Sequence, residues 1–210
     1  MKRREFIKNT SIVLSALMFT GCKNNVVFDK GEKKMKIFIL TGSPRKNGNS
    51  NTLADYFSKG ATEAGHNVVR FDSAFKNVNP CSACNKCNMD GKCVYKDDFQ
   101  FVKENIIDAD CVVFATPMYY FGISAQLKAV IDRFYSINGK ISTPKKAVLL
   151  MTYADTAKIE AEPIILHYKT LLNYLNWEDS GQIIASGVWS MGSINNTEYP
   201  KKAYELGKNI

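Results

Sequence analysis

Residues 36–52 read Lys36-Ile-Phe-Ile-Leu-Thr-Gly-Ser-Pro-Arg-Lys-Asn-Gly-Asn-Ser-Asn-Thr52. The first part, Lys36–Leu40, is apolar and partly β-branched, which is typical of a strand buried on both faces of a sheet. A polar loop follows, and a helical pattern covers Ser50–Ala64. A buried strand, a loop and a helix in this order predict the first half of a parallel β–α–β unit.

The same alternation continues to the end of the chain. Four further strands are expected at Asn67–Phe71, Cys111–Thr116, Ala147–Thr152 and Gln182–Ser186. Further helices are expected at Asp98–Ile107, Ser124–Tyr135, about Thr156–Leu175, and Tyr199–Lys208. The pattern predicts an α/β three-layer sandwich of the flavodoxin-like kind, with a five-stranded parallel sheet in the order 2-1-3-4-5. A ligand would then bind beyond the carboxyl ends of strands 1 and 3.

The loop after the first strand, residues 41–52, has the chemistry of a phosphate site. It combines hydroxyls, side-chain amides and a cation with the backbone N–H groups of a helix start. It is not a Walker A loop, because Asn49 rather than Lys follows Gly48, and the chain has no G-x-G-x-x-G pattern. These features favour a mononucleotide; the alternative is a polar turn with a good helix cap.

The loop after the third strand, residues 117–124, contains three consecutive aromatic residues: Tyr119, Tyr120 and Phe121. Aromatic side chains are costly to expose unless something covers them. A flat ring system would cover them by stacking, and backbone N–H groups near Gly122 would hold its polar edge. A subunit interface would also cover them, and the two interpretations are compatible.

Four cysteines lie within thirteen residues, with the spacing C-x2-C-x2-C-x5-C: Cys81, Cys84, Cys87 and Cys93. A tight three-cysteine coil with a fourth thiolate nearby is typical of a [4Fe–4S] site. Zinc remains an alternative, although it usually takes separated C-x2-C pairs. Two disulfides, or free thiols, are a further alternative. Cys111 lies in an apolar run and is expected to be a buried, inert thiol.

The first 34 residues are predicted to be a leader and a tether. Arg3-Arg4, Phe6-Ile7 and Lys8, followed by an uncharged stretch, resemble a twin-arginine export signal, which carries folded proteins. Residues 19–22, Phe-Thr-Gly-Cys22, resemble a lipobox, in which Cys22 is acylated. We therefore expect an export and lipoprotein signal at 1–22, a polar tether at 23–34, and anchoring by lipid at the cell envelope, on the periplasmic or extracytoplasmic face.

Composition narrows the class of protein. The 210 residues are 45% hydrophobic and 23% charged, as in an ordinary globular domain. The formal charge is +8, but no long Lys/Arg run occurs, so a nucleic-acid partner is not expected. No Ser/His/Asp set or carboxylate pair stands out, and Asp97-Asp98 is interpreted as a helix start. His66 and His167 are interpreted as structural residues.

These motifs together resemble the NADPH-dependent FMN reductase family over residues 35–210. The resemblance rests on Gly42-Ser43-Pro44-Arg45 with Gly48-Asn49-Ser50, and on the pattern from Pro117 and Tyr119 through Gln126-Leu127-Lys128 to Ile131-Asp132-Arg133. Within the family, the cysteine loop at 81–93 followed by Asp97-Asp98 resembles that of the iron–sulfur flavoproteins. That resemblance implies a homodimer in which a [4Fe–4S] cluster lies near FMN and exchanges electrons with it.

The resemblance also assigns roles to residues. It implies that the FMN phosphate is held by Ser43, Arg45, Asn49, Ser50 and Asn51. It implies that the isoalloxazine ring is lined by Pro117, Met118, Tyr119, Tyr120, Phe121 and Gly122, and that Tyr153 closes the site. The cluster ligands would be the four cysteines of the loop.

The sequence thus predicts a flavin-dependent oxidoreductase in which the side chains bind and tune cofactors rather than act as nucleophiles. One alternative is an FMN-only NAD(P)H-dependent reductase of quinones, flavins or nitroaromatics, with a zinc-bound or redox-active cysteine loop. Another is a non-enzymatic lipoprotein that binds a partner. Export would separate the protein from NAD(P)H, so a membrane quinol or a redox partner protein, such as a cytochrome or another redox lipoprotein, is also a candidate donor.

Overall fold

The structure is a computed structural model that describes residues 33–89 and 91–210. The predicted export signal, which includes Cys22, therefore lies outside the described residues. So do residues 23–32 of the predicted tether. Within the described part of the chain, no helix is long and apolar enough to cross a membrane.

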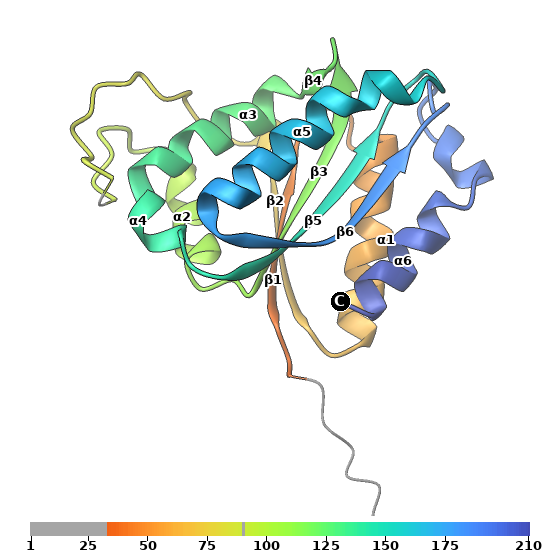
Figure 1. Ribbon diagram of the computed structural model, residues 1–210, viewed down its shortest axis with the longest axis horizontal. Helices are drawn as coiled ribbons and strands as arrows, with labels where there is room; N and C mark the ends of the chain where they lie inside the picture. Colours follow the sequence, from red (N-terminus) through yellow and green to blue (C-terminus); the bar gives the residue numbers. More distant parts are fainter. Residues whose placement is uncertain (1–32, 90) are drawn as a thin grey trace, which may run out of the picture. The chain divides into compact units, whose positions relative to one another are not determined.

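Five parallel strands form the predicted sheet (Figure 1). They are β1 (Lys36–Thr41), β2 (Asn67–Asp72), β3 (Cys111–Tyr119), β5 (Lys145–Thr152) and β6 (Trp177–Ala185). Their order is β2-β1-β3-β5-β6, which confirms the expected 2-1-3-4-5 arrangement. β6 begins five residues earlier than the apolar run predicts, because its first residues pair with β5 across a register shift between Ala147 and Leu149.

A sixth strand, β4 (Gly122–Ile123), was not expected. β3 continues past Thr116 to Tyr119, and β4 turns back to pair with it antiparallel, Met118 opposite Ile123. The segment predicted to be a loop is therefore a tight β-hairpin. Tyr120 and Phe121 form its turn, both in the left-handed region with φ of 46° and 61°. Such a turn is unusual for aromatic residues, so periodicity and propensity gave no sign of it.

Helices cover both faces of the sheet (Figure 1). One face carries α1 (Asn49–Glu63) and α6 (Tyr199–Lys208). The other carries α2 (Phe99–Ile106), α3 (Ala125–Asp132) and α5 (Lys158–Leu175), with the short α4 (Asn138–Ile141) nearby. α3 ends three residues before the predicted boundary, because the chain tightens into a 3-10 helix at Arg133–Ile137. Two more 3-10 turns occur at Ser73–Phe75 and Ser193–Asn196.

The strands supply two separate cores through their alternating side chains. In β1, Phe38 and Leu40 join the core under α2, α3 and α5, whereas Ile37 and Ile39 join the core under α1 and α6. Alternate residues of a strand point to opposite faces, so a strand that is apolar throughout can only be stable when both faces are covered. The sheet is thereby fixed, and loops at its carboxyl edge are held on a rigid base.

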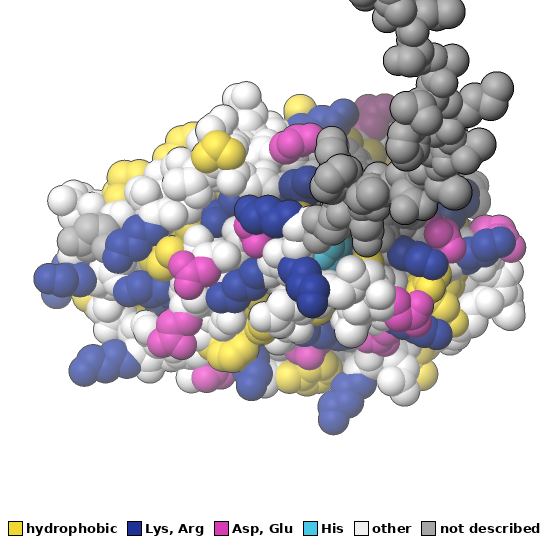
Figure 2. All heavy atoms as spheres, turned by 90° about the horizontal axis from the view of Figure 1, so that it is seen from below, with side chains coloured by type: hydrophobic (Ala, Val, Ile, Leu, Met, Phe, Trp, Pro, Cys, Tyr) yellow, Lys and Arg dark blue, Asp and Glu magenta, His cyan; other side chains and the backbone are white. Residues whose placement is uncertain are grey.

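The surface at the amino end of the sheet carries charges of both signs. Figure 2 shows Lys and Arg side chains interspersed with Asp and Glu over that face, rather than gathered in one basic stripe. Several of these charges form ion pairs, including Lys36 with Asp108 at 3.9 Å. Exposed ion pairs of this kind contribute little to stability. We therefore interpret this face as an ordinary solvated surface.

Candidate functional site

A cleft of about 800 Å³ opens at the carboxyl ends of the parallel strands. This size lies in the range of sites for small molecules and cofactors. Nine residues predicted to contact the cofactor lie in its wall: Ser43, Arg45, Asn49, Ser50, Pro117, Met118, Tyr119, Tyr120 and Tyr153. The two loops that the sequence singled out therefore meet at the expected edge of the sheet.

The first turn of α1 leaves polar atoms without partners. Among the described residues, Ser50 Oγ and Asn51 Oδ1 are buried and make no hydrogen bond. The N-cap of α1 is Gly48, which has no side chain to cap the helix. A Cβ at Gly48 would lie 2.5 Å from Ser43 Oγ, so the loop is too tight for a larger residue there. Free N–H groups at a helix start, beside unpartnered polar atoms and the exposed Arg45, fit a phosphate group.

Two of the predicted phosphate residues also brace the loop. Asn51 Nδ2 donates to the carbonyl oxygens of Arg45 and Lys46, at 2.9 and 3.1 Å, and Asn51 is not part of the cleft wall. Asn49 Nδ2 donates to the carbonyls of Val188 and Ser190, and its Oδ1 accepts from Gly192 N–H. Asn49 therefore ties α1 to the loop after β6.

The β3–β4 hairpin forms the aromatic side of the cleft. Tyr119 and Tyr120 line it, and Tyr120 is fully exposed. Phe121 and Gly122, which were predicted to line the isoalloxazine ring, are not in the wall of the cleft. They belong to the turn and to the returning strand of the hairpin. Phe121 is half exposed, so it presents apolar surface outside the cleft.

The sequence prediction missed one wall of the cleft, the loop after β6. Four residues of this loop line the cleft: Val188, Trp189, Ser190 and Met191. Thr152, the last residue of β5, and Ala154, just after it, also line the cleft. Trp189 is 80% exposed, which is unusual for so large an apolar side chain. The segment Gly187-Val-Trp-Ser-Met-Gly192, with glycines at both ends and an indole between them, was a signal that the sequence analysis did not use.

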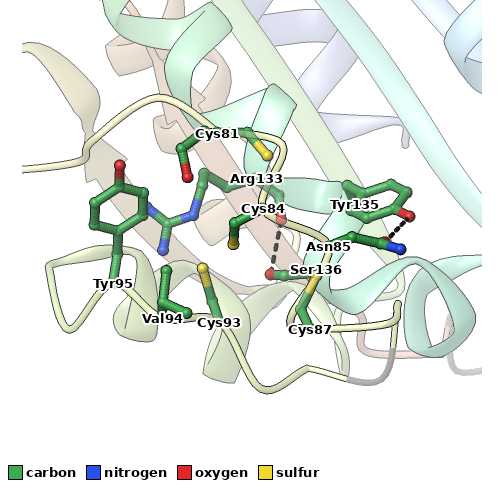
Figure 3. Close-up of a pocket in the computed structure, with 11 residues that line it drawn as sticks. Cys81, Cys84, Asn85, Cys87, Cys93, Val94, Tyr95, Arg133, Tyr135 and Ser136 are labelled. Atoms are coloured by element: carbon green, nitrogen blue, oxygen red, sulfur yellow. Dashed lines mark hydrogen bonds between the residues drawn. The ribbon is translucent and has the colours of Figure 1, made fainter.

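The four loop cysteines line a second pocket (Figure 3). In Figure 3 their side chains lie around it, with Tyr95 and Arg133 on one side and Tyr135 on the other. Cys87 is buried, Cys93 is half-buried, and Cys81 and Cys84 are exposed; all four are free thiols. The pocket holds only about 20 Å³, roughly one water. Of the described His, Cys, Asp and Glu side chains, no three are grouped so that they could hold a metal ion.

The backbone of the cysteine loop is unusual. Ala83, Asn85, Asn88 and Met89 all have positive φ, between 44° and 60°. Non-glycine residues rarely adopt this conformation, which costs of order 1–3 kcal/mol for each residue and persists where the surroundings impose it. One result is that Ala83 N–H donates to Cys81 Sγ at 3.4 Å. The loop therefore turns one backbone N–H toward sulfur.

A buried ion pair lies at the base of this loop. Arg133 donates to both carboxylate oxygens of Asp97, at 2.8 and 3.2 Å, and the two side chains are 1% and 3% exposed. Burial opposes ionisation of Asp97, but hydrogen bonds from Arg133 and Asn79 outweigh it and lower the pKa of the carboxyl. Asp97 also accepts from Phe99 N–H at the start of α2. From the sequence, Asp97 was interpreted as a helix start and as part of the resemblance, and Arg133 was given no role of its own.

Fold and cleft together define a flavodoxin-like α/β protein with a site suited to a mononucleotide at the carboxyl edge of its sheet. The family described as NADPH-dependent FMN reductase matches residues 35–177, more than half of the chain. The chain belongs to this family and is a flavin-dependent oxidoreductase.

Individual relatives agree with this assignment. An iron-sulfur flavoprotein of Archaeoglobus fulgidus is 29% identical over 177 residues, which cover 84% of this chain and 79% of the relative. An iron-sulfur flavoprotein of Methanocaldococcus jannaschii is 36% identical over 99 residues, 47% of this chain and 51% of the relative. A Bacillus subtilis protein named as a putative NAD(P)H-dependent FMN-containing oxidoreductase is 25% identical, covering 73% of this chain and 86% of its own.

Solved structures share the fold. An NAD(P)H:quinone oxidoreductase from Methanothermobacter marburgensis superposes with a TM-score of 0.69 at 20% identity, covering 84% of this chain and 96% of that one. An azoreductase from Bacillus anthracis gives a TM-score of 0.65 at 17% identity, with 84% of this chain and 100% of that chain covered.

Proposed function

We propose that this protein transfers electrons between FMN, bound in the cleft, and a [4Fe–4S] cluster held by Cys81, Cys84, Cys87 and Cys93. The observation that carries the proposal is that all four cysteines line one pocket on the same domain as the cleft. The relatives named iron-sulfur flavoproteins support it by similarity.

The chemistry of the cysteine loop fits a cluster better than a single ion. A single zinc is usually held by two separated C-x2-C pairs, whereas here Cys87 follows Cys84 after only two residues. Cluster thiolates instead bind separate irons, so their sulfurs are spread around a larger body. One positive-φ residue of the loop, Ala83, directs its N–H toward the sulfur of Cys81, and backbone donors of this kind support a thiolate that binds a metal.

The cleft would hold FMN through the residues that the structure leaves available there. Ser50 Oγ and the open start of α1 would receive the phosphate, and Arg45 would add a charge-assisted hydrogen bond. Tyr119, Tyr120 and Trp189 would cover the ring system. FMN supplies chemistry that accepts two electrons and releases them singly.

A second candidate is an FMN-only NAD(P)H-dependent reductase whose cysteines are zinc-bound or redox-active. One observation favours it: the cysteine pocket has room for little more than a water. The Bacillus subtilis relative, whose name mentions FMN alone, supports this alternative by similarity.

Location, donor and assembly form part of the proposal. We propose that residues 1–22 direct export of the folded protein and that Cys22 carries a lipid, which would place the domain outside the cytoplasm, where a membrane quinol or a redox protein is the donor. We also propose a homodimer, supported by the exposed Tyr120 and Phe121 beside the cleft. Cell fractionation, the mass of the mature amino terminus and sedimentation would test these points.

An anaerobic ultraviolet–visible spectrum tests the main proposal, with iron, zinc and FMN assayed on the same sample. Flavin bands over a broad iron–sulfur absorbance, with about four irons per chain, are expected. Flavin with no iron would replace the proposal with the FMN-only alternative. A colourless protein that takes up no added FMN would contradict both.

A further inference from the structure

Arg133 joins the two ends of the cysteine loop. Its Nη1 donates to the carbonyl of Asn79, two residues before Cys81, at 2.9 Å. Its guanidinium lies over the ring of Tyr95, two residues after Cys93, at 4.9 Å. The guanidinium also lies over the ring of Phe99, at 4.8 Å from the ring centre. One side chain therefore holds both the entry and the exit of the loop.

Asp97 completes this closure. It pairs with Arg133 in the bidentate geometry described above and also accepts from Asn79 N–H at 2.9 Å. Breaking a buried ion pair is strongly destabilising, because the remaining charge is left uncompensated. The base of the loop is thus fixed before any group binds between the cysteines.

One donor of Arg133 is left over. Within the described residues, Arg133 Nε is buried and has no hydrogen-bond partner. A buried donor without a partner is destabilising. Arg133 lines the same pocket as the four cysteines, and Figure 3 places it beside them. The donor and the cationic side chain accordingly face a site made of sulfur ligands.

We propose that Arg133 is a positioning residue for the group bound by the cysteines: it closes the loop and donates its Nε–H to that sulfur-rich group. This inference rests on the proposed cluster. A hydrogen bond and a positive charge beside a cluster favour the reduced state, which is the more negative one. Arg133 therefore raises the reduction potential of the cluster, and Asp97, as its counter-charge, limits that rise.

Two substitutions with opposite expected signs separate this role from simple structural damage. Arg133→Gln removes the positive charge and the Nε donor, and should shift the cluster potential to lower values. Asp97→Asn keeps the shape of the side chain but removes the negative charge, and should shift the potential to higher values. Mere disruption of the loop would reduce iron content in both variants without giving shifts of opposite sign.

Arg70→Gln is the matched control. Arg70 is also an ion-paired arginine, bound to Asp55 and Asp72, but it lies on β2 and lines neither pocket. The Arg70→Gln variant loses one positive charge, as Arg133→Gln does, and should leave the reduction potential of the cluster unchanged. Comparing it with Arg133→Gln isolates the effect of position from that of net charge.

The measurement is a dye-mediated redox titration of the full chain, followed by electron paramagnetic resonance, with iron and FMN assayed beforehand. Opposite shifts in Arg133→Gln and Asp97→Asn, with an unchanged control, are the expected result. A wild-type protein that binds FMN but no iron would overturn the proposed cluster and this inference with it. Full clusters with unchanged potentials would overturn this inference alone. If Arg133→Gln does not fold, the Asp97→Asn potential decides.

Discussion

At the scale of single residues, Cys111 and the loop cysteines have opposite surroundings. Cys111 is fully buried in β3, and burial raises the pKa of its thiol to about 12. The thiolate is the nucleophilic form, so Cys111 has almost none of it at neutral pH. We expect iodoacetamide at pH 8 to leave Cys111 unmodified in the native, metal-free protein while it labels the exposed Cys81 and Cys84.

Peptide mass mapping checks this prediction. The same treatment in denaturant is the control, because unfolding exposes every thiol and Cys111 should then be labelled completely. Labelling of Cys111 in the native protein at a rate close to that of Cys81 would contradict a rigid, fully packed β3.

Local sequence chemistry found most of the cleft but not its support. Ser50 and Arg45 were identifiable because a phosphate site needs hydroxyls, a cation and a helix start in one short segment. Arg133 and Asp97 stand 36 residues apart, and only the folded chain brings them together. Pairing over such a separation has no periodic signal in one sequence. The interaction of Asn49 with Ser190, 141 residues away, was hidden for the same reason.

At the scale of elements, α1 and α6 pack so closely that two glycines are required. A Cβ on Gly60 would lie 2.1 Å from the carbonyl oxygen of Tyr204, and a Cβ on Gly207 would lie 2.1 Å from that of Phe57. Alanine favours a helix over glycine by about 0.5–1 kcal/mol, so an exposed site would be stabilised. Here the backbones must separate, and we expect Gly60→Ala or Gly207→Ala to lower the free energy of unfolding by about 1–3 kcal/mol.

Gly139→Ala is the control for this prediction. Gly139 lies in α4, and a Cβ there would meet only the carbonyl oxygen of Met89, at an ordinary 3.7 Å. Its unfolding free energy should stay the same or rise slightly in a urea titration. Equal behaviour of all three variants would show that the α1–α6 contact is looser than the structure has it.

His167 in α5 faces charged residues of α3, and its protonation makes the stability of the fold depend on pH. Burial lowers the pKa of His167 below its usual value of about 6.5, and the nearby Lys128 lowers it further, against a smaller opposing effect of Asp132. The unfolded chain therefore binds the proton more readily than the folded one. Stability is lost as pH falls below about 6.5 and continues to fall down to the lowered folded pKa.

Replacing His167 with Gln removes this titration. We expect the melting temperature of His167→Gln to fall less than that of the wild type between pH 7 and pH 5. Parallel curves for the two proteins over this range would show that His167 titrates normally on the surface of α5.

Elements with a simple period were predicted well, and irregular ones were not. β1 is a continuous apolar run after Lys36 and α6 has the pattern of an amphipathic helix, and their bounds are close to the expected ones. The β3–β4 hairpin depends on two aromatic residues with positive φ, a choice made by the contacts of the folded chain. That α1 holds the loop at 187–192 through Asn49 was not predictable, because nothing within the segment itself indicates this partner.

At the scale of the whole molecule, α3 runs from the end at β4 to the end at α4 (Figure 1). Its N-cap, Ser124, follows the β3–β4 hairpin beside the cleft, and its C-cap is Arg133 beside the cysteines. The helix has eight residues and is therefore about 12 Å long. Yet the two pockets have no lining residue in common. The fold thus places the sites near one another while building each from different loops.

Separate construction predicts independent loading of the two cofactors. Cys87→Ser removes one proposed cluster ligand, and we expect it to abolish iron incorporation while changing the Kd for FMN by less than about twofold, since no cleft residue is disturbed. Arg45→Ala removes a charge-assisted hydrogen bond worth about 1.5–3 kcal/mol, and should weaken FMN binding about tenfold or more while leaving iron content unchanged. Titration by quenching of flavin fluorescence, with iron assayed in parallel, measures both effects. Loss of FMN affinity in Cys87→Ser would mean that the cysteine loop also shapes the cleft, which the separate walls of the two pockets argue against.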